Sequence, residues 1–284
     1  MTPAVLRQRL IAGEMLFGTL IVSPSPRWPE VVRSCGLDFV FIDTEHIALD
    51  RAELSWMCRT YAALGLPPLV RIPSPDPYAA AMVLDGGAAG VIAPYVETAE
   101  QVQTLRGAVK LRPIKGQKLR QMLEGAKVDP ELKSYMDAGA KNRLLIVNIE
   151  SVPAIEALDE ILAVPDLDAV LIGPHDLSCS LDVPEQWEHP KFLSACETIF
   201  RKARAAKVGA GIHFWGSVEQ QVSMLKLGAN LLIHSADITL FQKHLRTELE
   251  AIKKAAGLCS ATGEARSDIK ISRPVSDKGK KPST

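Results

Sequence analysis

The sequence has no long apolar run and no excess of charge. No segment approaches the ~20 consecutive apolar residues that a membrane-spanning helix needs, and Arg7, Arg9 and Glu14 interrupt the N-terminal stretch where a signal peptide would lie. Lys plus Arg equals Asp plus Glu, 33 each, so the charge balance favours neither nucleic acid nor an anionic membrane. We therefore expect a cytoplasmic protein with no nucleic-acid partner and no membrane association.

Several motifs that mark other protein classes are also missing. The five cysteines show neither a CxxC pair nor zinc-ligand spacing, which predicts reduced thiols in a cytosolic protein. There is no P-loop and no GxSxG elbow. The first apolar strand segment, GTLIVSPSP, holds a single glycine, which excludes a dinucleotide-binding fingerprint at that position.

The sequence does contain a repeated alternation of apolar strands and helical segments. Near-continuous apolar strands are typical of parallel sheets that are buried on both faces, and eight strand–helix units close a barrel. We therefore predict an α/β fold with a single (β/α)8 TIM barrel in residues 1–257, a short N-terminal helix, and a disordered polar tail in 258–284. The expected strands are 17–23, 39–43, 67–72, 90–96, 143–150, 169–174, 209–214 and 230–235.

Polar side chains gather where these strands end, which is where the active sites of such barrels lie. The strand FVFID runs into Asp43, Glu45 and His46. Each residue alone has an ordinary explanation: an exposed loop carboxylate, a hydrogen-bonded histidine or a turn cap. Their concentration at one end of the barrel instead favours an active site. The other strand-end residues are Arg71, Asn148, Glu150, His175, Asp176, His213, His234 and Asp237.

These residue types suit chemistry on a small oxo acid. Glu150 and Asp176 offer two carboxylates to a hard octahedral cation such as Mg²⁺ or Mn²⁺. Arg71 offers a planar fork for a carboxylate or oxyanion, and His46 is a candidate general base that Asp43, three residues earlier, could orient. Together they favour proton removal beside the carbonyl of a metal-chelated 2-oxo acid. No strand ends in lysine, which argues against a Schiff-base aldolase.

The motifs FIDTEH, LVRIP, LDGGAAGVIAPYVETAEQ, IVNIES and LIGPHDLS resemble the HpcH/HpaI family of class II metal-dependent pyruvate aldolases, within the citrate lyase β-subunit/PEP-pyruvate barrel superfamily. The resemblance covers about residues 5–257. It implies that Glu150 and Asp176 hold a divalent cation (Mg²⁺ or Mn²⁺, with Co²⁺ as a further candidate). It also implies that Arg71 stabilises the carbonyl and enolate oxygen, and that His46 and Asp43 form the acid/base dyad.

The same resemblance carries further expectations. It implies that the backbone from Gly173 to His175 meets the substrate carboxylate, that Glu45 lies in the water network of the metal, and that Asp85 reaches the site from a neighbouring subunit. It implies a homo-oligomer, a hexamer formed as a trimer of dimers that exchange their last helix. Asn148 stands where many members have glutamine, and His175 where they usually have a small residue. Both changes bear on which sugar-type substrate is used.

The expected function is reversible aldol cleavage of a 4-hydroxy-2-oxo acid into pyruvate, or a related 2-oxo acid, and an aldehyde. One alternative is a related carbon–carbon lyase or synthase of the citrate lyase β or malyl-CoA lyase type, although GTLIVSPSP lacks the arginine-serine motif of the CoA-dependent members. Another is a non-catalytic oligomeric barrel. The basic stretch from Lys110 to Arg120 is open to three interpretations: a solvated loop, a selector of anionic aldehydes, or a nucleic-acid contact.

Overall fold

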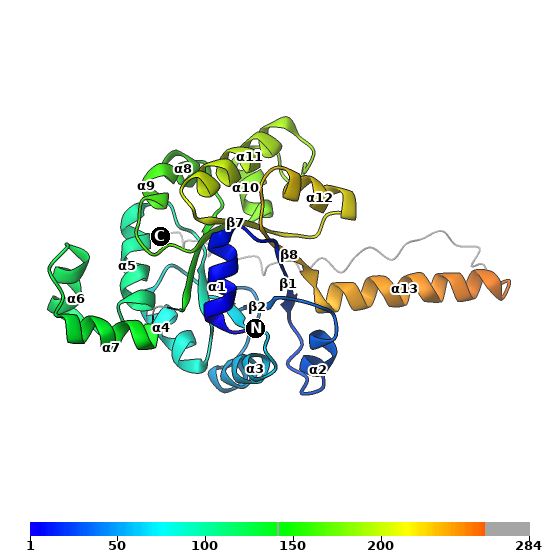
Figure 1. Ribbon diagram of the computed structural model, residues 1–284. Coiled ribbons are helices and arrows are strands. Elements are labelled where there is room, and N and C mark those ends of the chain that lie inside the picture. Colours follow the sequence, from blue (N-terminus) through cyan, green and yellow to red (C-terminus); the bar gives the residue numbers. More distant parts are fainter. Residues whose placement is uncertain (141, 259–284) are drawn as a thin grey trace, which may run out of the picture. The chain divides into compact units, whose positions relative to one another are not determined.

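The computed structural model describes residues 1–140 and 142–258. Eight parallel strands follow one another around a closed barrel in chain order, and helices surround them (Figure 1). The predicted (β/α)8 barrel and its short N-terminal helix are confirmed. The strands are β1 Leu16–Ile21, β2 Phe39–Asp43, β3 Pro68–Arg71, β4 Gly90–Ala93, β5 Leu144–Ile149, β6 Ala169–Ile172, β7 Gly209–Phe214 and β8 Leu231–Ala236.

The connections between strands are helical and mostly short. Several helices begin with a side-chain cap, and α5 and α12 carry complete capping boxes through Thr98 with Gln101 and Ser217 with Gln220. The helices are α1 Pro3–Ala12, α2 Trp28–Arg33, α3 Arg51–Ala63, α4 Pro77–Gly86, α5 Ala99–Lys110, α6 Gly116–Leu123, α7 Pro130–Ala140, α8 Val152–Glu156, α9 Leu158–Leu162, α10 Pro174–Ser180, α11 Pro190–Ala205, α12 Val218–Lys226 and α13 Asp237–Ala255.

The core has two layers, as the apolar faces of the strands require. One set of buried side chains fills the barrel, including Phe39, Phe41 and Ile146, and a second set lies between the strands and the helices. Helix α1 adds Leu6 and Leu10, both 0% exposed, to the set inside the barrel. The amino ends of the strands are therefore closed by α1, and the carboxyl ends remain available for a site.

The same closed end carries a buried ion cluster. Asp168 is 0% exposed and lies 2.5 Å from both Arg7 of α1 and Lys110 of α5. Burial lowers the pKa of Lys110, and the charge of Asp168 opposes that shift. Lys110 is thus part of the structure rather than of a solvated loop, and Arg112 also has a partner, Asp85.

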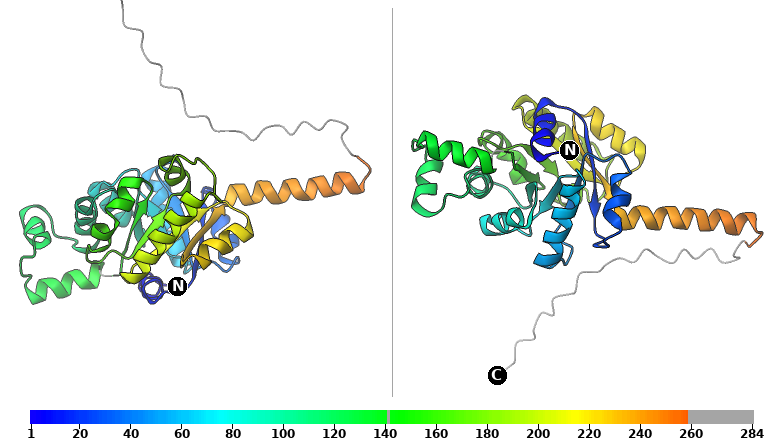
Figure 2. Two further views of the ribbon diagram at one scale, coloured as in Figure 1. Left: turned by 90° about the horizontal axis from the view of Figure 1, so that it is seen from above. Right: turned by 60° about the horizontal axis from the view of Figure 1, so that its bottom comes forward.

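The long connection from α5 to β5 forms a pair of helices, α6 and α7. They project from the ring of helices in both views of Figure 2 (green). Since α5 descends from the carboxyl end of β4 to the amino end of β5, the connection leaves the barrel at its closed end. Within one chain, this insertion is therefore remote from the strand ends that carry the predicted site.

The chain divides into two compact units, Met1–Phe241 and Gln242–Thr284. The first contains the barrel, and the predicted boundary at residue 257 stays a prediction. In α13, Phe241, Leu245, Leu249 and Ile252 are exposed. The tail predicted to be disordered lies outside the described residues, except for Leu258. In the part of the chain that is described, no helix is both long and apolar enough to cross a bilayer.

Candidate active site

Asp43 and Arg71 are directly opposite each other because β2 and β3 pair in the register that aligns them. Arg71 donates from Nε to Oδ1 of Asp43 at 2.9 Å and from Nη2 to Oδ2 at 2.6 Å. Burial alone would raise the pKa of Asp43, but the hydrogen bonds and charge of Arg71 outweigh it and lower that pKa. The result is a fixed, charged pair in which the guanidinium plane is held by two parallel hydrogen bonds.

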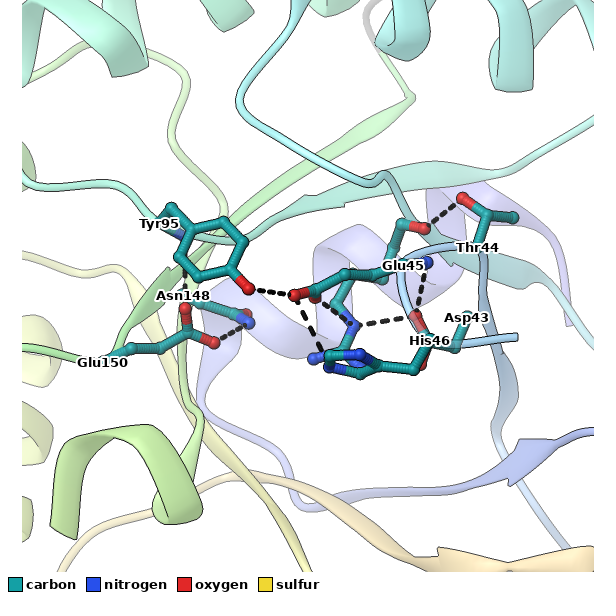
Figure 3. Close-up of polar contacts among 8 residues, drawn as sticks. Asp43, Thr44, Glu45, His46, Tyr95, Asn148 and Glu150 are labelled. Carbon is teal, nitrogen blue, oxygen red and sulfur yellow. Dashed lines mark hydrogen bonds and ion pairs between the residues drawn. The ribbon is translucent and has the colours of Figure 1, made fainter. Parts of the chain in front are cut away.

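Glu45 is the carboxylate nearest the predicted base. Its Oε1 lies 3.4 Å from Nε2 of His46 (Figure 3), and its Oε2 lies 3.2 Å from Nε of Arg71. The sequence suggested that Asp43 orients His46. In the structure Asp43 is held by Arg71, and the side chain that contacts His46 is Glu45. The imidazole is about half exposed, so it faces the mouth of the barrel.

Glu150, which follows β5, is the better buried of the two predicted metal ligands. Its Oε1 accepts a hydrogen bond from Nδ2 of Asn148 at 2.6 Å, and its Oε2 accepts one from the backbone N–H of Tyr95 at 3.1 Å. Burial raises the pKa of Glu150, and the charge of Asp176 raises it further while both hydrogen bonds lower it. Asp176 lies in the first turn of α10, so the two carboxylates come from neighbouring strand ends.

The backbone at Gly173 leaves no room for a side chain beside Glu150. A Cβ at Gly173 would lie 2.5 Å from Oε1 of Glu150, closer than two such atoms can approach. The residue predicted to meet the substrate carboxylate therefore packs directly against a predicted metal ligand. The φ of Gly173 lies outside the left-handed region, so the backbone conformation does not require glycine. The close approach of Glu150 does.

The donor set fits a hard divalent cation. The Oδ1 atom of Asn148 is buried and has no hydrogen-bond donor among the described residues, which is costly unless another group fills the position. Glu150 and Asp176 add oxygen ligands of the kind that Mg²⁺ and Mn²⁺ prefer. Over residues 1–140 and 142–258, no cluster of three or more His, Cys, Asp or Glu side chains could hold a metal. The remaining positions around a cation would therefore fall to water and substrate.

Two predicted residues lie apart from this group. His175 is the second residue of α10, and its side chain is exposed, with Nδ1 3.2 Å from Glu185. Asp85 is near the end of α4, at the closed end of the barrel, and it forms an ion pair with Arg112. Within one chain, Asp85 therefore lies away from the carboxyl ends of the strands, where the site is. Its predicted role at the site of a neighbouring subunit stays a prediction.

Tyr95 contacts two of the predicted site residues, and the sequence analysis did not identify it. Its hydroxyl donates to Oε1 of Glu45 at 2.6 Å, while its backbone N–H holds Glu150 (Figure 3). The hydrogen bond to Glu45 raises the pKa of Tyr95 to about 12, and partial burial adds to the shift. The available signal was its place in IAPYVE, directly after the fourth apolar strand.

His213 and Arg71 both lie beside the ring of Phe41. The imidazole is 5.1 Å from the ring of Phe41, and the guanidinium carbon of Arg71 lies 5.5 Å from the centre of that same ring. Burial lowers the pKa of His213 to about 3, so the ring is neutral near pH 7. Its Nε2 lies 3.1 Å from the carbonyl oxygen of Ser235. His213 is thus a buried, hydrogen-bonded histidine.

Comparison with known proteins identifies the family of this chain. A family model described as HpcH/HpaI aldolase/citrate lyase matches residues 17–243. The 2-keto-3-deoxy-L-rhamnonate aldolase of Escherichia coli (strain K12) is 30% identical over 247 residues, which cover 87% of this chain and 92% of that protein.

Solved structures give the same relation. An HpcH/HpaI aldolase from Desulfitobacterium hafniense is 28% identical, with a TM-score of 0.76, and the match covers 88% of this chain and 96% of that one. The citrate synthase SbnG is 27% identical, with a TM-score of 0.74 and coverage of 89% and 98%. The resemblance inferred from the motifs is therefore confirmed: the chain belongs to the HpcH/HpaI aldolase/citrate lyase family.

Proposed function

We propose that this aldolase reversibly cleaves a 4-hydroxy-2-oxo acid into pyruvate, or a related 2-oxo acid, and an aldehyde, with a divalent cation held by Glu150 and Asp176. The chain is a carbon–carbon lyase of the aldolase type. The observation that carries the proposal is the position of the Arg71–Asp43 pair beside the Glu45–Tyr95–Glu150 hydrogen bonds. The guanidinium of Arg71, the candidate base His46 and the two candidate oxygen ligands thus come from strand ends at the same end of the barrel.

The charges of the site support a requirement for a cation. Four carboxylates, those of Asp43, Glu45, Glu150 and Asp176, stand against the guanidinium of Arg71. This excess of negative charge would repel the carboxylate of a 2-oxo acid at these distances. A bound divalent cation removes most of the excess, and it would polarise the 2-oxo carbonyl as a Lewis acid.

The side chains of this chain then have separate roles. The imidazole of His46, whose Nε2 faces Glu45, takes the proton of the 4-hydroxyl group at its other nitrogen, Nδ1, the C3–C4 bond breaks, and the aldehyde forms. The electron pair passes to the 2-oxo fragment as an enolate, and the protonated His46 returns its proton to C3 to give pyruvate. Arg71, whose orientation is fixed by Asp43 and Glu45, donates to the oxygen on which negative charge develops.

The name of the relative from Escherichia coli supports this substrate class, because a 2-keto-3-deoxy sugar acid is a 2-oxo acid. The likeness to a citrate synthase favours a second candidate, a carbon–carbon lyase or synthase in which the same site joins an oxo acid to the enolate of an acetyl donor. The two functions share proton removal beside a carbonyl, and they differ in the second substrate.

A single screen tests both candidates. The protein is loaded with Mg²⁺, Mn²⁺ or Co²⁺ and assayed for pyruvate release from a panel of 4-hydroxy-2-oxo acids, with oxaloacetate condensation and acyl-CoA cleavage alongside. We expect metal-dependent release from the hydroxy-oxo acids. Equal activity of chelator-treated and metal-loaded protein would refute the metal requirement, and turnover of acyl-CoA substrates alone would favour the lyase alternative.

We also propose that the protein is a homo-oligomer, with a hexamer as the expected form. Phe241, Leu245, Leu249 and Ile252 recur at helical spacing along α13 and are exposed in the single chain, as expected for a helix that packs against another copy. Light scattering coupled to size-exclusion chromatography measures the mass directly. A monomer at micromolar concentration would contradict the proposal.

A further inference from the structure

Tyr95 has an unusual backbone conformation for its residue type. Its φ is 54°, in the left-handed region that favours glycine. It follows Pro94 at the end of β4, and Nε2 of Gln101, from the capping box of α5, lies 3.4 Å from the carbonyl oxygen of Tyr95. The backbone is therefore held in this conformation from the following helix.

That conformation lets one residue contact two carboxylates from different strand ends. The N–H of Tyr95 binds Oε2 of Glu150 at 3.1 Å, and its hydroxyl binds Oε1 of Glu45 at 2.6 Å. The side chain is 52% exposed, so burial of its ring does not explain why a tyrosine is found here. The two hydrogen bonds do.

We propose that Tyr95 is a positioning residue: its hydroxyl fixes Glu45 against His46 and Arg71, while its backbone N–H fixes Glu150. The inference rests on the proposed function, in which His46 moves a proton and Glu150 binds metal. Nε and Nη2 of Arg71 both donate to Asp43. The carboxylate that contacts the imidazole of His46 is that of Glu45. Tyr95 thereby sets the separation between the metal side and the proton-transfer side of the site.

A conservative substitution isolates the hydroxyl. Tyr95→Phe keeps the ring and the backbone N–H, and it removes the bond to Glu45. A hydrogen bond to a charged group is worth enough to change a rate about tenfold or more. We expect kcat for exchange of the pyruvate methyl protons in D₂O to fall about tenfold. KM and the Kd for Mn²⁺, measured by electron paramagnetic resonance, should stay within about twofold, because the contact with Glu150 remains.

A double-mutant cycle separates this role from a general effect on the fold. In a Glu45→Ala background the hydroxyl has lost its acceptor, so Tyr95→Phe should change the exchange rate less than about twofold. Tyr78→Phe is the matched control, since Tyr78 is 83% exposed on α4, and it should leave all values unchanged. Equal effects of Tyr95→Phe in both backgrounds, or no effect in either, would overturn the inference.

A measurement without turnover distinguishes this inference from the proposed function. In metal-free protein, Tyr95→Phe should shift the ring resonances of His46 by NMR, and Tyr78→Phe should not. Unmoved resonances overturn the inference whatever the activity. Failure of the wild type to exchange pyruvate protons with any metal would instead refute the proposed function, while shifted resonances would still support the positioning role.

Discussion

Replacing Arg71 by lysine keeps the positive charge and removes the planar fork. The guanidinium makes two hydrogen bonds to Asp43, at 2.9 and 2.6 Å, and its Nε lies 3.2 Å from Glu45. Its carbon also lies 5.5 Å from the centre of the Phe41 ring. A lysine ammonium can point at only one of these partners at a time, so the direction of the remaining donors is lost.

The cost to catalysis follows from that loss of direction. Removing a preorganised donor to a developing oxyanion costs ~3 kcal/mol, or roughly a hundredfold in rate. Because Arg71→Lys still attracts an anionic substrate, the loss should appear in kcat, with KM changed by less than about threefold. The position of the donor is decisive here, since the charge itself is preserved.

The assay follows pyruvate methyl-proton exchange in D₂O by NMR, together with kcat and KM for cleavage of the best substrate from the screen. Arg51→Lys is the matched control, because Arg51 begins α3 as an exposed residue. If Arg71→Lys keeps kcat within about threefold of wild type, the guanidinium does not stabilise the developing charge, and the reasoning fails.

The same variant has a consequence for acid stability. The folded-state pKa of Asp43 is lowered, so its contribution to stability is present above the unfolded-state pKa and is lost as pH falls through the lower folded-state value. Arg71→Lys weakens the interaction that lowers this pKa. We therefore expect acid unfolding, followed by circular dichroism, to move to higher pH than in wild type. An unchanged acid midpoint would contradict the assigned cause of the shift.

Five further changes test the site and the chain boundaries. Glu150→Ala and Asp176→Ala should each abolish metal-dependent turnover and weaken Mn²⁺ binding with the far-UV circular dichroism retained; unchanged Mn²⁺ affinity would exclude them as ligands. Gly173→Ala places a Cβ 2.5 Å from Oε1 of Glu150, so the Kd for Mn²⁺ should rise about tenfold or more, measured by titration. His46→Ala should suppress pyruvate proton exchange while Mn²⁺ still binds, and wild-type exchange would rule out the imidazole as base. Removal of 258–284 should leave thermal stability and turnover nearly unchanged, because that sequence offers few apolar side chains for packing; a large fall in the melting temperature would show otherwise.

The alternation of apolar strands and helices was enough to predict the barrel. Each strand is apolar along nearly its whole length, for example LLIVNI in β5, in which all six residues are buried. The backbone of such a segment is fully hydrogen-bonded, and its side chains are fully buried, when it lies between two parallel strands with helices packed outside them. Because local sequence also marks where each strand ends, the sequence predicted which polar residues gather at one end of the barrel.

The partners within that group were decided by the tertiary structure. The spacing of DTEH suggested a contact between Asp43 and His46, yet Asp43 binds Arg71, 28 residues later in the chain. A solvated loop was one of three interpretations of the basic stretch that begins at Lys110, but Lys110 lies buried against Asp168, 58 residues away. Tyr95 contacts Glu45 and Glu150 over separations of 50 and 55 residues. Sequence spacing fixes which side chains stand at a strand end, whereas the register between neighbouring strands and the turn after each strand fix which charges meet.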